Sequence, residues 1–254
     1  MLQKFLASVG IGAAKVDTIL EKEKYFAGEE VRGIVHVKGG NVPQQVDSIY
    51  LTVFGSYIRE VDDKKVTAVH ALYKHRLTDR IDIVPAEEKT IPFSFLLPVD
   101  TPVTFGSGKV WIHTGLDISS SVDPTDKDFI EVLPNPLIAG VIQATEQLGF
   151  RLRQTECKEI PFRLRERIPF AQELEFIPVY GMFRGKLDEL ELLLFPRSNE
   201  ELRIIMEIDR KARGLAGLFS EALDLDETHV QLVVKPADIP TLAEILQETI
   251  SKYC

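Results

Sequence analysis

The stretch KTIPFSFLLP, residues 89–98, has two near repeats later in the chain, KEIPFRL from Lys158 and RIPFAQELEFIP over residues 167–178. In each copy a basic or polar residue precedes Ile-Pro-Phe, and apolar residues then alternate with others. Such alternation is typical of a half-buried β-strand. Proline lacks a backbone N–H and is tolerated only at strand starts and sheet edges. We therefore predict that these prolines start, end or border edge strands and do not shape a catalytic loop.

Alternating segments fill the first half of the chain. Seven or eight of them occur in about 120 residues and are separated by short turns. That density of strands predicts a β-sandwich, which we place at residues 1–134. The clearest examples are VRGIVHVKG from Val31, VDSIYLTVFGSYIRE from Val46 and VTAVHALYKHRL from Val66.

A helix marks the boundary between the two halves. Asn135 is a suitable N-cap, Pro136 fits the first helical position, and Gly149 ends the apolar stripe. Strands then resume, and Thr241 with Glu244 predicts a capping box at the start of a C-terminal helix. We expect an all-β fold of two tandem sandwiches, residues 1–134 and 135–254, with a short linker helix and a C-terminal helix.

Composition limits the classes of partner. A net charge of −9 repels phosphate, so we expect no nucleic-acid binding. No apolar run reaches the ~20 residues that cross a bilayer, so we expect no integral membrane segment. Leu2, Phe5, Leu6 and Val9 predict a short amphipathic N-terminal helix. That helix either packs on the protein body or makes a peripheral contact with a membrane or a partner.

Seven motifs along the chain are recognisable together. They are ASVGIGAAKVDTIL at 7–20, GIVHVKGG at 33–40, IPFSFLLPVDTPVT at 91–104, TGLDI at 114–118, FAQELEF at 170–176, LDELEL at 187–192 and EIDRKARGL at 207–215. With these motifs, in this order and over nearly the whole chain, the sequence resembles the sporulation-control protein M family of spore-forming bacteria. The resemblance implies two arrestin-like β-sandwich domains and a cytoplasmic regulatory role in sporulation without catalytic activity.

The sequence GSGK at residues 106–109 does not fit a phosphate-binding loop. That motif requires Gly at 103 and Ser or Thr at 110, where this chain has Val103 and Val110. A strand, not a helix, is expected to follow. We interpret the stretch as a hairpin turn and expect no cofactor.

Three aspartates form a weak candidate for a metal site. Asp123, Asp126 and Asp128 lie close together in VDPTDKDFIE. Clustered carboxylates bind calcium, but the EF-hand spacing and its central glycine are absent. A solvated acidic turn before a strand is the alternative that we favour.

Histidine and cysteine offer little support for catalysis. His113 lies near Trp111 and Asp117, but on a strand the three residues share one face, and no nucleophile motif is present. We favour a histidine on the face of a sheet. Cys157 lies in an alternating strand without a neighbouring histidine, so we expect a buried, inert thiol. Neither Cys157 nor Cys254 suggests a disulfide framework.

Arginines alternate in RLRQ and RLRER. If both runs are strands, each can line one face of a sheet, as a groove for an acidic partner segment. A solvent-facing set paired with the acids of DELEL is the other interpretation. The candidates for protein binding are Arg151, Arg153, Arg163, Arg165 and Arg167.

The main hypothesis is a non-enzymatic cytoplasmic adaptor that binds other proteins through sheet edges or between its sandwiches. It rests on the resemblance and on the lack of a coherent catalytic set. The alternative is an enzyme or a carbohydrate-binding protein with its site in the loops from His113 to Asp128. Self-association as a homodimer is a third possibility.

Overall fold

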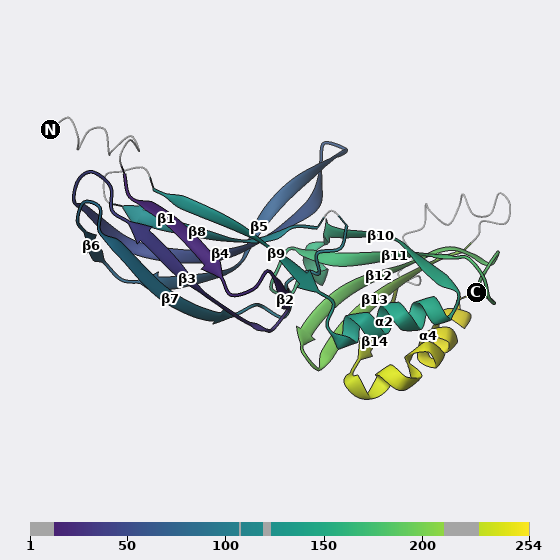
Figure 1. Ribbon diagram of the computed structural model, residues 1–254. Helices are drawn as coiled ribbons and strands as arrows, with labels where there is room; N and C mark the ends of the chain where they lie inside the picture. The colour runs from purple at the N-terminus through teal and green to yellow at the C-terminus, as the bar shows by residue number, and fades with distance from the viewer. Residues whose placement is uncertain (1–12, 107, 119–122, 211–228, 254) are drawn as a thin grey trace. The chain divides into compact units, whose positions relative to one another are not determined.

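The computed structural model describes residues 13–106, 108–118, 123–210 and 229–253 (Figure 1). The expected N-terminal helix, Cys254 and the stretch 211–228 lie outside these ranges. The chain forms two compact units: Met1–Ser56, Val69–Thr101 and Lys109–Leu133 make the first, and Tyr57–Ala68, Pro102–Gly108 and Pro134–Cys254 make the second. This division differs from a single boundary after residue 134, because two segments of the first half group with the second unit.

The strands of the first half alternate buried and exposed residues, as their sequences predict. They are β1 (Lys15–Leu20), β2 (Lys24–Phe26), β3 (Glu30–Lys38), β4 (Gln44–Val61), β5 (Lys64–Thr78), β6 (Ile81–Ile83), β7 (Glu88–Leu96), β8 (Val110–Ile118) and β9 (Thr125–Leu133).

Two sheets face each other in the first unit. One is three-stranded, in the order β1-β3-β7, and the other contains β4-β8-β9-β2, with β5 and β6 paired to β4. Fully buried valines of β3 and isoleucines of β4 and β8 fill the space between them. A buried hydrogen bond of 2.6 Å joins the hydroxyls of Thr18 and Thr114 across the two sheets. The first unit is therefore a β-sandwich, as expected.

The second unit has one large antiparallel sheet, in the order β14-β13-β12-β11-β10. The fold is therefore mostly β, as expected. The elements of this part are α2 (Pro136–Gln147), β10 (Phe150–Glu159), the 3₁₀ helix η1 (Phe162–Leu164), β11 (Phe170–Pro178), β12 (Leu187–Ser198), β13 (Glu201–Arg210), β14 (His229–Val234), the 3₁₀ helix η3 (Pro236–Thr241) and α4 (Leu242–Ser251).

Two helices cover one face of that sheet, where we expected a second layer of strands. Figure 1 shows α2 and α4 side by side across the strands. Leu242, Leu246 and Ile250 of α4 are fully buried, and they share a core with the apolar stripe of α2. Because two helical stripes already cover the apolar face, the core needs no second sheet. No helix in the described ranges is both long and apolar enough to cross a membrane.

The ends of the helices agree with the sequence only in part. The side chain of Asn135 accepts a hydrogen bond of 3.0 Å from the N–H of Ile138, as predicted for an N-cap. Gly149 follows α2 with a φ of +92°, and a Cβ there would lie 2.3 Å from the carbonyl oxygen of Tyr180. The capping box at Thr241 does not form, because η3 leads directly into α4 and the Thr241 hydroxyl donates to Asp238 at 3.4 Å.

The prolines follow the predicted rule incompletely. Pro92 lies within β7, an edge strand of the three-stranded sheet. Pro169 directly precedes β11 and Pro178 ends it, but β11 has strand partners on both sides. Proline therefore marks the ends of β11 but lies in the middle of β7, and the expectation that all these strands are edges is wrong.

Two short segments of the first half complete the second unit. The ring of Tyr57 stacks on Phe170 with centroids 4.8 Å apart. Gln172 on β11 holds the backbone of Val103 twice, since its Oε1 accepts from the N–H at 2.9 Å and its Nε2 donates to the carbonyl at 2.7 Å. The Gln172 side chain thus satisfies both backbone polar groups of Val103.

Candidate functional site

The second arginine run lies on a loop. Pro161 and Pro169 interrupt the pairing of β10 with β11, and the N–H of Ile160 donates to the carbonyl of Pro169 at 3.1 Å, which closes the loop. We call residues 161–169 the Phe162 loop. The prediction that its three arginines alternate on a strand is wrong, because a proline at each end removes the N–H groups that pairing requires. Arg163 lies in η1, Arg165 follows it, and Arg167 comes just before β11.

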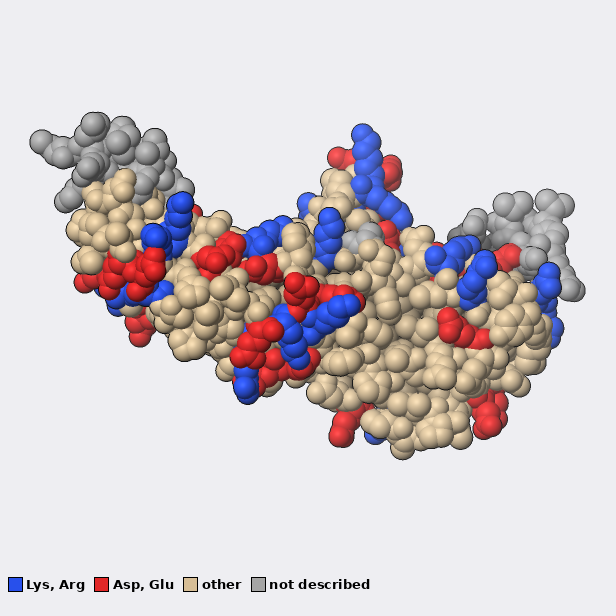
Figure 2. All heavy atoms as spheres, viewed as in Figure 1, with Lys and Arg blue, Asp and Glu red and all other residues tan. Residues whose placement is uncertain are grey.

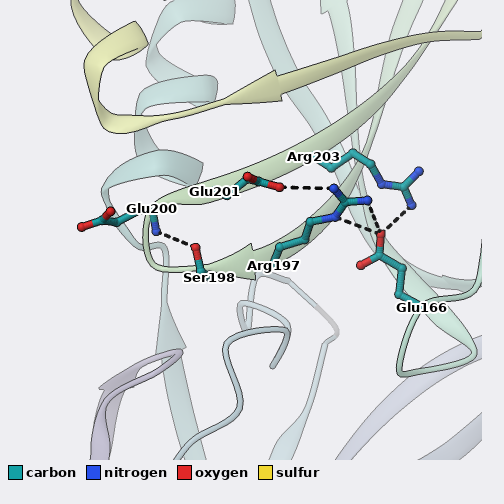
Figure 3. A network of polar contacts seen from close by, with 6 residues as sticks. All are labelled: Glu166, Arg197, Ser198, Glu200, Glu201 and Arg203. Carbon is teal, nitrogen blue, oxygen red and sulfur yellow. Dashed lines mark hydrogen bonds and ion pairs between the residues drawn. The ribbon is translucent and has the colours of Figure 1, made fainter.

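Ion pairs hold this loop in place (Figure 3). Glu166 accepts hydrogen bonds from Arg197 on β12, at 3.2 and 3.3 Å, and pairs with Arg203 on β13 at 3.0 Å. Arg197 also pairs with Glu201 at 3.2 Å. The neighbouring Arg165 ties the loop to the end of β10, since it donates to the carbonyl of Ile160 at 3.0 Å and to Glu159 at 2.9 Å.

An apolar cluster lies on the same face as the loop. Ile160, Ala171, Phe195 and Ile205 are buried together, with Leu164 of the loop packed against them. The guanidinium of Arg203 lies 4.1 Å from the centre of the Phe195 ring, and its side chain is only 10% exposed. The loop is therefore fixed by packing as well as by charge.

Phe162 protrudes from this fixed base. This residue is 86% exposed, the largest exposure among the large apolar residues of the described ranges. Sequence reasoning missed it, because Ile-Pro-Phe was interpreted as the start of a strand in every copy.

The first arginine run belongs to β10. A bulge between Leu152 and Gln154 breaks the alternation of this strand. Arg153 forms ion pairs with Glu175 on β11 and Glu189 on β12. For Arg153 the solvent-facing ion-pair interpretation therefore applies. Arg151 is exposed, opposite Ile177 of β11. The five candidate arginines do not share one face.

Acidic side chains form a row across the helix-free face of the second sheet. Glu175, Glu191 and Glu207 lie directly opposite one another on β11, β12 and β13. Burial, and then the nearby Glu173 carboxylate, raises the pKa of Glu191 to about 7, although Lys158 opposes the shift. Lys158 also forms an ion pair with Glu173. Figure 2 shows acidic and basic side chains intermixed on the visible face, which agrees with local pairing.

The three candidate aspartates do not gather in one metal-binding cluster, although Asp126 and Asp128 lie close to each other. Asp123 accepts a hydrogen bond of 3.0 Å from the N–H of Ile118, and Asp126 accepts one of 2.7 Å from the N–H of Thr18. Burial, and then the charge of Asp126, raises the pKa of Asp128 to about 6. No three His, Cys, Asp or Glu side chains of the described ranges gather in a geometry that holds a metal ion. The carboxylates of Asp123 and Asp126 thus act as acceptors for backbone N–H groups of neighbouring strands.

His113 lies on the face of a sheet, as predicted. It shares the outer side of β8 with Trp111, and its ring meets Phe54 edge-on at 6.0 Å. A groove of about 570 Å³ on the three-stranded sheet has Ile19, Ile34 and Pro92 in its lining. A second hollow of about 480 Å³ lies beside Phe105 and residues 152–156. Neither is lined by His113 or by residues 123–128, so they do not support the alternative of an active site there.

The burial of Cys157 confirms the prediction of a buried, inert thiol. It is 5% exposed, and burial, followed by the charge of Glu156, raises the pKa of the thiol to about 12. A thiol with such a pKa supplies almost no thiolate near neutral pH.

Comparison with known proteins agrees with the resemblance in the sequence. Residues 2–212 match the family model described as SpoOM protein. The sporulation-control protein spo0M of Bacillus subtilis (strain 168) is 43% identical over 254 residues, which cover 99% of this chain and 98% of that protein. The crystal structure of Spo0M from Bacillus subtilis matches with a TM-score of 0.85 and 41% identity, over 96% of this chain and all of that chain. This chain belongs to the SpoOM protein family.

Proposed function

We propose that this chain is a cytoplasmic regulator of sporulation that acts without catalysis, by binding other proteins. The sporulation role is supported by its near-full-length similarity to the Bacillus subtilis sporulation-control protein. The mode of action is supported by one feature above all, the exposed Phe162 on its anchored loop.

The Phe162 loop has the properties of a binding anchor. Aromatic side chains are enriched among the residues that dominate binding energy at protein interfaces. Because Glu166 and Arg165 already fix the loop, docking costs little further ordering of the chain. The exposed ring of Phe162 fits a partner surface with a hydrophobic pocket best. Strand addition at an edge such as β7 offers a second contact.

Complementation in a spore-forming bacterium tests the proposal. A strain that lacks its own spo0M gene is supplied with this chain, and heat-resistant spores are counted. We expect the wild-type chain to restore the count and Phe162→Ser to fail at an equal protein level. Leu96→Ser is the matched control, because Leu96 is 66% exposed in the first unit.

The negative outcomes separate the role in sporulation from the contribution of the Phe162 loop. If the wild-type chain leaves the spore count unchanged, the role in sporulation is wrong. If Phe162→Ser restores the count as well as Leu96→Ser does, the loop is not the contact. A crosslink between two copies at position 162 would identify the partner as a second copy of the chain.

A further inference from the structure

Three aromatic rings form a row across the outer face of the sandwich. Phe54 on β4 lies opposite Trp111 on β8, and Trp111 lies opposite Phe129 on β9. Their ring centroids are 5.6 and 5.9 Å apart. Thr114 of β8 faces inward to Thr18, so Trp111, an odd number of residues away, faces outward. Phe129 is 55% exposed, so one end of the row is open to solvent.

Two lysines lie over the rings of this face. The Nζ of Lys127 is 4.2 Å from the centre of the Trp111 ring and 4.6 Å from that of Phe129. The Nζ of Lys74 on β5 is 3.9 Å from the centre of the Tyr50 ring. An ammonium group is attracted to the negative face of an aromatic ring. We call Tyr50, Phe54, Lys74, Trp111, Lys127 and Phe129 the aromatic–lysine face.

These lysines differ from others in the same protein. Lys24, Lys38 and Lys158 each pair with a glutamate. In the described part of the chain, neither Lys74 nor Lys127 forms an ion pair. Among the described residues, no carboxylate lies within ion-pair distance of either ammonium group.

The centre of this face contains no acid, and the nearest acids on the same side are Asp117 of β8 and Glu131 of β9, at its two ends. Three neighbouring rows cross β4, β8 and β9, and each has three residues in register. They are Tyr50–Gly115–Thr125, Thr52–His113–Lys127 and Phe54–Trp111–Phe129. None of the nine residues is acidic, although 39 of the 254 residues of the chain are Asp or Glu. The three central rows therefore form a positive, aromatic area on a protein of net charge −9.

We propose that the aromatic–lysine face docks an acidic segment of a partner protein. The carboxylates of that segment meet Lys74 and Lys127, and an apolar side chain of the segment packs on the exposed Phe129. Charge complementarity selects this occupant, because the two lysines have no anion of their own and an acidic residue is absent from the three rows. The inference rests on the proposal that the protein works by binding other proteins, but it concerns a surface separate from the Phe162 loop.

Binding at this face can be followed by tryptophan fluorescence, because Trp111 is the single tryptophan of the chain. Purified full-length protein is titrated with a short tryptophan-free peptide rich in Asp and Glu, with a central Phe. We expect a saturable change in tryptophan emission that weakens as salt is added. The same peptide with Lys in place of its acids should give none.

Charge reversal at the face supplies the matched variants. We expect Lys74→Glu and Lys127→Glu together to weaken peptide binding by about tenfold or more, since both attractions become repulsions. Lys38→Glu, which makes the same charge change on the three-stranded sheet, should bind as the wild type does. Thermal unfolding checks that each variant is folded.

Three outcomes would overturn the inference. They are an unchanged emission with the acidic peptide, equal binding by the double variant, and tighter binding of a single-stranded oligonucleotide or a neutral oligosaccharide than of the peptide. None of them alters the spore counts of the Phe162 variants, so failure here is distinct from failure of the proposed function.

Discussion

Glu191 on β12 lies directly opposite Glu175 on β11, with both carboxylates on the face of the sheet that the helices leave uncovered. Glu207 continues the row on β13. Like charges directly opposite each other destabilise a sheet. Arg153 pairs with Glu175, whereas burial, and then the charge of Glu173, raises the pKa of Glu191 to about 7.

Replacing Glu191 should therefore make stability less dependent on pH. The pKa of Glu191 in the folded protein, about 7, lies above its ordinary value of 4.5. The folded state binds the proton more tightly, so stability falls as the pH rises through this window. We expect Glu191→Gln to stabilise the protein by about 1 kcal/mol at about pH 8 and hardly at all at about pH 5, since solvent screens a partly exposed group.

Urea unfolding at the two pH values measures this effect. Glu189→Gln is the control, because Glu189 pairs with Arg153 and its loss should not stabilise the protein. An equal gain from Glu191→Gln at both pH values would contradict the assignment of the raised pKa.

The Phe162 loop should depend on the pair of Glu166 and Arg203. A double-mutant cycle with Glu166→Ala and Arg203→Ala should give a coupling energy of about 1 kcal/mol or more, because Arg203 is nearly buried. The cycle with Glu166→Ala and Arg197→Ala should give less, since Arg197 is more exposed. Equal coupling in the two cycles would show that burial of Arg203 does not strengthen the pair.

The helix between the halves should weaken when it loses its cap. Asn135→Ala removes the acceptor for the N–H of Ile138, and we expect a loss of about 1 kcal/mol in the free energy of unfolding. Asn135→Ser should retain most of the stability, because serine is also a good N-cap. If Asn135→Ala costs nothing, the cap bond does not contribute to stability.

Cys157 should react only when the protein unfolds. In a Cys254→Ser background, a thiol reagent should label Cys157 at the rate of unfolding, since the thiol is buried and its pKa is about 12. Adding urea should accelerate labelling in parallel with the loss of structure. Rapid labelling of the native protein would show that the thiol is accessible.

Local patterns in the sequence predict most of the fold. Alternation locates the strands of the sandwich, and Asn135 with Pro136 locates the start of α2. The helical layer on the second sheet is not predictable in the same way, because an apolar sheet face packs equally well against strands or helices. Pro161 and Pro169 did contain the signal for a loop, but the alternation of arginines between them suggested a strand.

Binding surfaces are harder to infer than elements. The row of Phe54, Trp111 and Phe129 depends on the register of three strands, which a single sequence does not fix. The position of the Phe162 loop likewise depends on the ion pair between Glu166 and Arg203, two residues that are far apart in the sequence. Both features arise from pairings between residues that lie far apart in sequence.

The division of the chain has a consequence for its synthesis. Tyr57 and Val103 leave the ribosome well before Phe170 and Gln172, the residues that hold them in the finished protein. A nascent chain that ends at β9 therefore presents both apolar side chains without their cover. Translation must continue into β11 before either side chain is buried. A stalled or truncated product therefore exposes apolar surface that favours aggregation and that is buried in the complete protein.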